Sequence, residues 1–225
     1  MGKLINLEGC DSAGKTTQIK FIKEYFENIG KTVKHIHFPM YGHNMFSELI
    51  SSFLRGEYGD NNSVDPIFVS NIYSMDRYMY KEQILKDLEE YDILLVDRYV
   101  FSNVAYQVSK VKDDYFKSKE ELMNHIIDFE FNFLNLPYPD LILFLDVPIF
   151  EIEKRLNIER VGEDRDYLNG KQDVHEKNIS YQEDVRSVYL SLHGTKNYKI
   201  INTYDKRILE PKVIFESYKE YLTLK

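Results

Sequence analysis

Short apolar runs alternate with longer segments of helical periodicity along this chain. The short runs are rich in β-branched residues and cover residues 3–8, 33–38, 92–97, 141–146 and 198–202. Between them, apolar positions recur at helical spacing in residues 15–28, 44–54, 66–89, 102–109, 119–134, 150–158, 174–192 and 209–222. This alternation predicts an α/β fold in three layers, with a five-stranded parallel sheet and helices on both faces.

The chain is long enough for one such domain. It has 225 residues, of which 43% are apolar, and this supports one full core. Gly and Pro interrupt the pattern at 56–62, 137–139 and 162–170 without a repeat or a low-complexity tract. We therefore expect a single domain over residues 1–225, in which 162–170 is the loop best suited to move.

Charge and cysteine content narrow the class of partner. Lys and Arg total 29 against 37 Asp and Glu, a net charge of -8, which argues against binding nucleic acid or an acidic membrane surface. The single cysteine, Cys10, cannot form an intramolecular disulfide, and no apolar run of about 18 residues is present. The first residues contain no targeting pattern. We expect a cytoplasmic protein whose anion site is built locally.

A phosphate-binding loop follows the first predicted strand. The sequence matches the pattern GxxxxGK[ST] and continues with a second threonine: Gly9, Cys10, Asp11, Ser12, Ala13, Gly14, Lys15, Thr16 and Thr17. The glycines allow the backbone amides to point inward, Lys15 can reach the β and γ phosphates, and the Thr16 hydroxyl can ligate Mg²⁺. The pattern predicts an ATP site with Mg²⁺; the alternative is a glycine-rich turn that binds nothing.

An aspartate ends each of two apolar strands. Asp97 closes residues 93–97 and suits a carboxylate that holds the Mg²⁺ hydration shell. It could instead be a helix N-cap, and Asp146 after residues 143–145 is a competing candidate of the same form. We favour Asp97 because of the residues that follow it.

Those residues combine charge, amide and aromatic groups. At helical spacing, Arg98, Ser102 and Tyr106 share one face, and Asn103 and Gln107 lie beside it. The mixture can bind a phosphate, a base edge and a sugar, although a solvated helix face would also be polar.

Two further residues of the long helical segment form a pair. Tyr73 and Arg77 are i,i+4 neighbours that could stack on a base and donate to its carbonyl. The alternative is a packed tyrosine beside a surface arginine.

With these motifs, the sequence resembles the thymidylate kinase family. The resemblance covers nearly the whole chain and is carried by GCDSAGKTTQ at 9–18, FP at 38–39, DRY at 97–99, SNVAYQ at 102–107 and an arginine-bearing lid at about 155–172. The loop alone is shared with many nucleotide-binding proteins, whereas DRY followed by SxxAYQ is more specific. The resemblance implies a homodimeric P-loop kinase that binds ATP and dTMP as its small-molecule partners.

The resemblance also implies roles for individual residues. Asp11 would accept from the 3′-hydroxyl and Tyr106 would occupy the place of a 2′-hydroxyl. Tyr73 would stack on thymine, and Arg77 would donate to its O4. Arg98 would hold the acceptor phosphate, Asn103 would face the base, and Phe38 and Gln107 would add further substrate contacts.

The comparison with the family also covers the lid arginines and two positions at which this chain differs from the family's pattern. Arg155 would lie near adenine, and Arg160 and Arg165 near the transferred phosphoryl group; alternatively, all three are solvated partners of nearby acids. Tyr41 stands where many members carry arginine, and Ser12 where some do. The resemblance therefore implies that Arg98 takes a larger share of the acceptor phosphate and that the lid supplies positive charge.

These features predict ATP-dependent phosphorylation of dTMP to dTDP. Lys15, Arg98, Arg160 and Arg165 would be catalytic by positioning and charge, and an ionised phosphate acceptor needs no general base. The alternatives are another deoxynucleotide or deoxynucleoside kinase and a non-catalytic ATP-dependent switch module. The sequence does not rank dTMP against dUMP.

Overall fold

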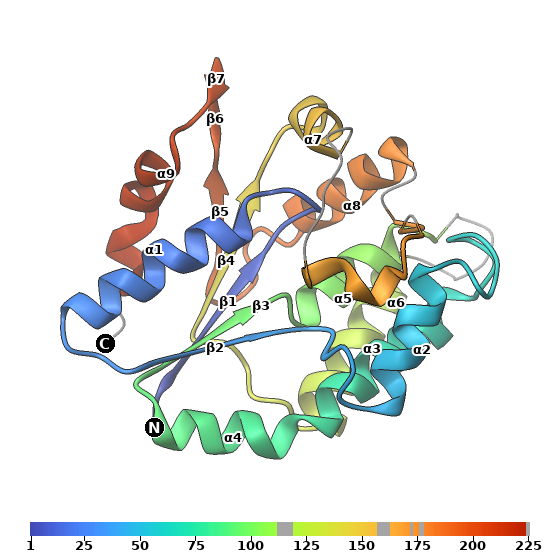
Figure 1. Cartoon of the computed structure of the whole chain (residues 1–225), viewed down its shortest axis with the longest axis horizontal. Coiled ribbons are helices and arrows are strands. Elements are labelled where there is room, and N and C mark those ends of the chain that lie inside the picture. Colours follow the sequence, from blue (N-terminus) through green and yellow to red (C-terminus); the bar gives the residue numbers. More distant parts are fainter. Residues whose placement is uncertain (112–118, 157–162, 172, 176–177, 224–225) are drawn as a thin grey trace.

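Five parallel strands form the central sheet of the computed structural model (Figure 1), which describes residues 1–111, 119–156, 163–171, 173–175 and 178–223. In spatial order they are β2 (Val33–His37), β3 (Ile93–Asp97), β1 (Lys3–Glu8), β4 (Leu141–Asp146) and β5 (Tyr198–Asn202). All four pairings are parallel. The predicted five-stranded parallel sheet is confirmed.

Helices connect successive strands. In the described part of the chain they are α1 (Lys15–Asn28), α2 (Met45–Leu54), α3 (Pro66–Met79), α4 (Lys81–Glu90), α5 (Val100–Val108), α6 (Lys119–Ile127), α7 (Ile149–Leu156), α8 (Ile179–Ser191) and α9 (Pro211–Tyr218). A π-helical segment η1 (Asp128–Phe133) continues α6, and short 3-10 segments form η2 (Glu163–Leu168) and η3 (Lys219–Leu222). None of the helices in these described ranges is long and apolar enough to span a membrane.

The helices cover both faces of the sheet, as predicted. On one face α1 packs against β1, β2 and β3 and lies beside α9. On the other face α5 contacts α3, α6 and α8. In turn α3 packs against α2, and Figure 1 shows these two helices beside each other.

Several predicted boundaries were wrong. The helix expected over 66–89 is two helices separated at Tyr80, whose amide bonds to the Arg77 carbonyl rather than one residue further back. The segment expected over 119–134 changes to π geometry at Asp128, and the helix expected from 174 begins only at Ile179, where Asn178 caps it. A hairpin of β6 (Tyr204–Asp205) and β7 (Arg207–Ile208) was not predicted.

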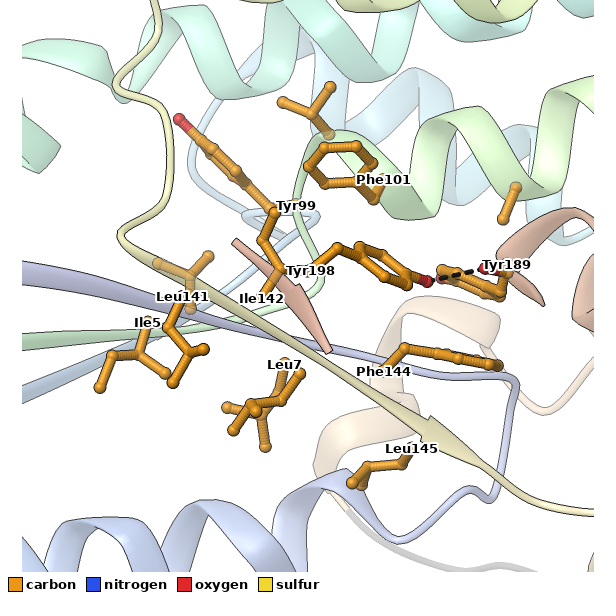
Figure 2. Close-up of a cluster of buried hydrophobic side chains, with 14 of the residues drawn as sticks. Ile5, Leu7, Tyr99, Phe101, Leu141, Ile142, Phe144, Leu145, Tyr189 and Tyr198 are labelled. Atoms are coloured by element: carbon orange, nitrogen blue, oxygen red, sulfur yellow. Dashed lines mark hydrogen bonds between the residues drawn. The ribbon is translucent and has the colours of Figure 1, made fainter. Parts of the chain in front are cut away.

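The main core lies between the sheet and its helices. Alternate side chains of β4 point to opposite faces, so Phe144 stacks on Tyr189 of α8 while Leu145 lies on the other side (Figure 2). A smaller cluster joins α2, α3 and the segment around η2, with Leu54, Val69, Leu168 and Val174 buried in it. Because β1, β3 and β4 are parallel, their carboxyl ends lie at the same edge of the sheet. This edge lies between the main core and the smaller core of α2 and α3.

The Phe144 ring should be essential for the stability of this core. It is 1% exposed and its centroid lies 4.7 Å from that of Tyr189. We expect Phe144→Ala to lower the free energy of unfolding by about 3–5 kcal/mol, because it leaves a cavity between β4 and α8. Urea denaturation measures this. The control Phe133→Ala removes a ring that is 72% exposed and should change stability by no more than about 0.5 kcal/mol; equal losses would contradict the assignment of the core.

Candidate active site

The loop after β1 has the geometry of a phosphate cradle. Gly14 caps α1 with φ 91°, in the left-handed region that favours glycine. A Cβ on Gly9 would lie 2.9 Å from that of Ala13, so a larger residue does not fit. The loop therefore closes tightly over the start of α1, whose amides and dipole attract anions.

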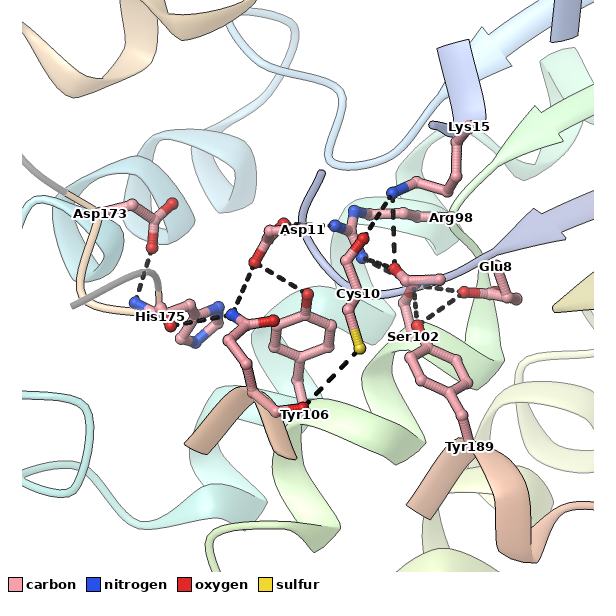
Figure 3. A network of polar contacts seen from close by, with 12 residues as sticks. Glu8, Cys10, Asp11, Lys15, Arg98, Ser102, Tyr106, Asp173, His175 and Tyr189 are labelled. Atoms are coloured by element: carbon pink, nitrogen blue, oxygen red, sulfur yellow. Dashed lines mark hydrogen bonds and ion pairs between the residues drawn. The ribbon is translucent and has the colours of Figure 1, made fainter. Parts of the chain in front are cut away.

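Lys15 folds back over this loop. Its Nζ lies 3.4 Å from the carbonyl oxygens of Gly9 and Cys10, and the side chain is buried (Figure 3). Burial, together with the nearby charge of Arg98, lowers the pKa of Lys15, whereas Asp97 and Asp11 oppose that shift. The ammonium thus lies beside the loop where a bound polyphosphate would need it.

Oxygen ligands for a hydrated Mg²⁺ are available beside the lysine. Asp97 is 5% exposed at the end of β3, and its Oδ1 has no hydrogen-bond partner among the described residues. Thr16 is exposed in the first turn of α1. The competing candidate, Asp146, instead accepts two hydrogen bonds from Arg186, at 2.6 and 3.0 Å. Hard oxygen donors with an unfilled acceptor fit Mg²⁺ at Asp97 better than at Asp146.

Arg98 connects the acceptor side to the phosphate loop. Its Nη2 donates to Asp11 Oδ1 at 2.5 Å and its Nη1 to the Gly9 carbonyl at 3.1 Å. The residue adopts φ 62°, which turns the side chain back toward the loop as the chain leaves β3. Tyr106 supports the guanidinium, which lies 5.2 Å above the ring centroid.

Three donors converge on the Asp11 carboxylate. Besides Arg98, the Tyr106 hydroxyl and the Gln182 amide each donate to Oδ2 at 2.9 Å. Burial disfavours the carboxylate, but the charges of Arg98 and Lys15 outweigh it and hold the pKa of Asp11 well below its ordinary value of 3.8. Asp11 is therefore ionised at neutral pH and can accept one further donor.

A second buried carboxylate, Glu8, lies next to the hydrogen bonds around Asp11 and Arg98. Glu8 ends β1 and accepts from the Tyr99 amide, the Ser102 hydroxyl and the Tyr189 hydroxyl. Burial raises the pKa of Glu8, although these hydrogen bonds and Arg98 oppose the rise. Ser102, which was predicted only to share a face with Arg98, thus ties α5 to the sheet (Figure 3).

The residues predicted to face the base lie together on α3 and α5. Asn103 donates from Nδ2 to the Ser70 carbonyl on α3, at 2.9 Å. Arg77 is 2% exposed and forms a two-point ion pair with Glu130 of η1, at 2.5 and 2.6 Å. It is therefore not a surface arginine. Its predicted contact with O4 stays a prediction, and so does the stacking role of Tyr73.

Gln107 and Phe38 occupy different surroundings. Gln107 is 1% exposed, and neither atom of its amide has a partner among the described residues. Phe38 is a core residue, 1% exposed, with its ring centroid about 6 Å from those of Tyr80 and Tyr99. Unfilled hydrogen-bonding capacity marks Gln107 as the better candidate for a ligand contact.

The expected lid is only partly within the described residues. Tyr167 of η2 stacks on Tyr41 at 4.1 Å with nearly parallel rings, so the position that often carries arginine holds an apolar contact here. Arg155 of α7 donates to the Ser12 carbonyl at 2.7 Å, which places it at the phosphate loop. Arg160 and the side chain of Arg165 lie outside the described residues.

Sequence reasoning missed Glu8 and several polar residues that reach the site from distant parts of the chain. Gln182 and His175 reach Asp11 and Tyr106 from the C-terminal part of the chain, Tyr189 reaches Glu8, and Glu130 reaches Arg77. No motif marks these positions. A glutamate in an apolar segment at 129–134 was the only available signal, because a buried acid needs a partner.

The sheet order, the loop and the residues at its edge define the class of P-loop nucleotide-binding α/β proteins. A family model described as thymidylate kinase matches residues 7–210. The chain belongs to the thymidylate kinase family.

Individual relatives agree with this assignment. A thymidylate kinase of Mycobacterium tuberculosis (strain H37Rv) is 31% identical over 137 residues, which span 61% of this chain and 62% of that enzyme. One from Thermoanaerobacter sp. (strain X514) is 29% identical over 98% of this chain and 99% of its own length. A thymidylate kinase structure from Candida albicans has a TM-score of 0.69 at 24% identity and covers 98% of this chain and 93% of that one, which supports the fold.

The ionised Asp11 should make stability depend on pH. Because the folded pKa lies below the unfolded one, the carboxylate stabilises the fold above about pH 3.8, and this contribution is lost as the pH falls toward the folded pKa. We expect Asp11→Asn to cost about 2 kcal/mol at pH 7 and the difference from the unmodified chain to shrink below pH 4. Denaturant titrations between pH 3 and 7 measure it. The exposed Asp205, changed to Asn, is the control; a constant difference for Asp11→Asn would contradict the assignment.

Proposed function

We propose that this chain transfers the γ-phosphoryl group of ATP to dTMP and releases dTDP and ADP. The observation that carries the proposal is the position of Arg98, whose guanidinium bonds both to the Gly9 carbonyl in the phosphate loop and to Asp11. A cation of the acceptor side thus lies against the loop that holds the donor phosphates. Membership of the thymidylate kinase family supports the substrate pair.

The chain's own residues would act by positioning and charge. The loop amides and Lys15 hold the phosphates of ATP, Asp97 and Thr16 would hold Mg²⁺, and Arg98 aims an oxygen of the acceptor phosphate. That oxygen forms the new bond to the γ-phosphorus as the bond to the β-phosphate oxygen breaks. Bound Mg²⁺ supplies neutralising charge on the phosphates. The acceptor oxygen is already ionised, so no side chain needs to remove a proton.

Asp11 and the base-facing residues would select the acceptor. Asp11 has capacity for the 3′-hydroxyl, and Tyr106, held by Asp11, would stand where a 2′-hydroxyl would go. Arg155 on the loop is suited to the adenine side of ATP. We further propose that residues 1–225 act as one domain. Within it, residues 155–172 would close as a lid and bring Arg160 and Arg165 near the transferred group. We also propose that the protein works in the cytoplasm.

An ADP-release assay with ATP and a panel of acceptors tests the proposed reaction. We expect release to depend on dTMP, with lower rates for dCMP, AMP and GMP and none for thymidine, which has no phosphate for Arg98. The rate with dUMP measures what the 5-methyl group adds. A preference for thymidine would indicate a deoxynucleoside kinase, and release independent of every acceptor would indicate a switch module.

Lys15 should be required for turnover. We expect Lys15→Ala to lower kcat by about 10²–10³-fold, because its charge acts on the transferring group in a site that excludes water. Steady-state kinetics of Lys20→Ala, on the exposed side of the same helix, are the matched control and should stay near those of the unmodified chain. Equal effects would show that Lys15 matters only for the stability of α1.

We also propose that the chain forms a homodimer through α3. Phe68 and Met79 are 65% and 57% exposed, and with Met75 they follow one stripe of that helix. Light scattering should give twice 26.8 kDa, and Met79→Asp should shift the mass to one chain. Ile29→Asp, at an equally exposed apolar position after α1, should leave it unchanged; a monomer at all concentrations would contradict this proposal.

A further inference from the structure

Glu130 contacts both Arg77 and Asn103, whose polar groups were predicted to bind the base. It lies in the π-helical segment η1 and is 0% exposed. Its Oε2 accepts from Arg77 Nε at 2.5 Å, and its Oε1 accepts from Arg77 Nη2 at 2.6 Å and from Asn103 Nδ2 at 2.8 Å. A buried carboxylate with these partners has a fixed position.

The contacts of Asn103 determine which way its amide points. Nδ2 lies beside the Ser70 carbonyl, the Ser74 hydroxyl and the Glu130 carboxylate. A carbonyl and a carboxylate can only accept, so the NH₂ group must face them. The Asn103 Oδ1 atom is consequently turned away as an acceptor, and it has no partner among the described residues.

The pairing of Arg77 likewise leaves one group free. The guanidinium meets Glu130 through Nε and Nη2, and the described residues provide no hydrogen bond to Nη1. Burial disfavours the charge, but Glu130 outweighs that effect and raises the pKa of Arg77, so Nη1 remains a donor. One donor, Arg77 Nη1, and one acceptor, Asn103 Oδ1, thus remain on two side chains that share the Glu130 Oε1 atom, with Tyr73 one turn before Arg77 on α3.

We infer that Glu130 is a positioning residue that selects the base of the acceptor nucleotide, an inference that rests on the proposed function. An acceptor beside a donor complements the imide edge of thymine or uracil, in which N3–H donates and O4 accepts. Cytosine presents the opposite pattern, so both groups would meet their like. A buried site with unmatched polar groups rejects a ligand strongly. The same edge occurs in uracil, so this device separates dTMP and dUMP from dCMP and not from each other.

Glu130→Gln tests the inference directly. The neutral amide keeps the size of Glu130 but weakens the ion pair with Arg77 and offers Asn103 only one acceptor oxygen, so the Arg77 donor and the Asn103 amide are held less firmly. We expect the ratio of kcat/KM for dTMP to that for dCMP to fall at least about tenfold, with KM for dTMP raised and KM for ATP unchanged. The matched control is Asp128→Asn in the same segment, whose exposed carboxylate accepts from Asn132; its ratio should not change.

Glu130→Asp provides a second test if the first variant does not fold. It keeps the charge but is one methylene shorter, so we expect a smaller fall in the same ratio. For the unmodified chain, N3-methyl dTMP should lose at least about 100-fold in kcat/KM relative to dTMP, because it removes the donor that Asn103 Oδ1 needs.

The outcomes separate the two proposals. If the unmodified chain does not phosphorylate dTMP, the proposed function fails. If it does, but the Glu130 variants lose dTMP and dCMP activity equally, or lose ATP affinity to the same degree, Glu130 is only structural and the inference is overturned. Equal use of N3-methyl dTMP and dTMP would also overturn it.

Discussion

The ion pair between Arg98 and Asp11 is the interaction on which the site depends. It joins the end of β3 to the phosphate loop, and it is mostly buried, with 16% and 19% of the two side chains exposed. Arg98 reaches the loop only because its backbone adopts φ 62°, a conformation that costs a non-glycine residue about 1 kcal/mol or more. The Tyr106 ring and the Gln182 amide hold the pair in place. Buried charges of this kind are stable only when fully paired.

The same constraint explains how an acidic protein builds an anion site. The net charge is -8, yet Lys15, Arg98 and Arg155 all contact the phosphate loop. The carboxylates that act on Lys15 are Asp11 in the loop itself and Asp97 and Glu8 at the ends of β3 and β1. Arg77, on α3, belongs to a separate ion pair with Glu130 of η1. In the proposed function, phosphate binding relies on the pair of Arg98 with Asp11, and base selection relies on the pair of Arg77 with Glu130.

Much of the fold could be predicted from the sequence, because buried parallel strands and amphipathic helices have clear periodicity. Three strands begin and end where expected, and α1 does so as well. The break at Tyr80 and the π-helical segment after Ile127 lack a local signal, since no Gly or Pro marks them. At the site, the loop residues and the DRY segment were found because each forms a short continuous motif, although the contacts between them join distant parts of the chain. Gln182, His175 and Glu130 act across long sequence separations, so only the fold brings them to their partners.

Position 41 holds tyrosine where many members of the family carry arginine, and this changes which residues are available to bind the acceptor phosphate. Tyr41 stacks on Tyr167, so it adds apolar contact between the 163–171 segment and the loop after β2, where it cannot neutralise a phosphate. In the proposed function, the charge for the acceptor comes from Arg98, whose Nη2 already bonds to Asp11. Nη1 donates to the Gly9 carbonyl at 3.1 Å and to the Ser102 hydroxyl at 3.4 Å. Hydrogen bonds of this length are weak, so Nη1 can exchange them for a bond to another acceptor. An incoming phosphate, with more charge than a carbonyl, would take that nitrogen, while Asp11 keeps the guanidinium in place. The pair with Asp11 therefore lowers the cost of orienting Arg98 and leaves one face of the cation for the acceptor.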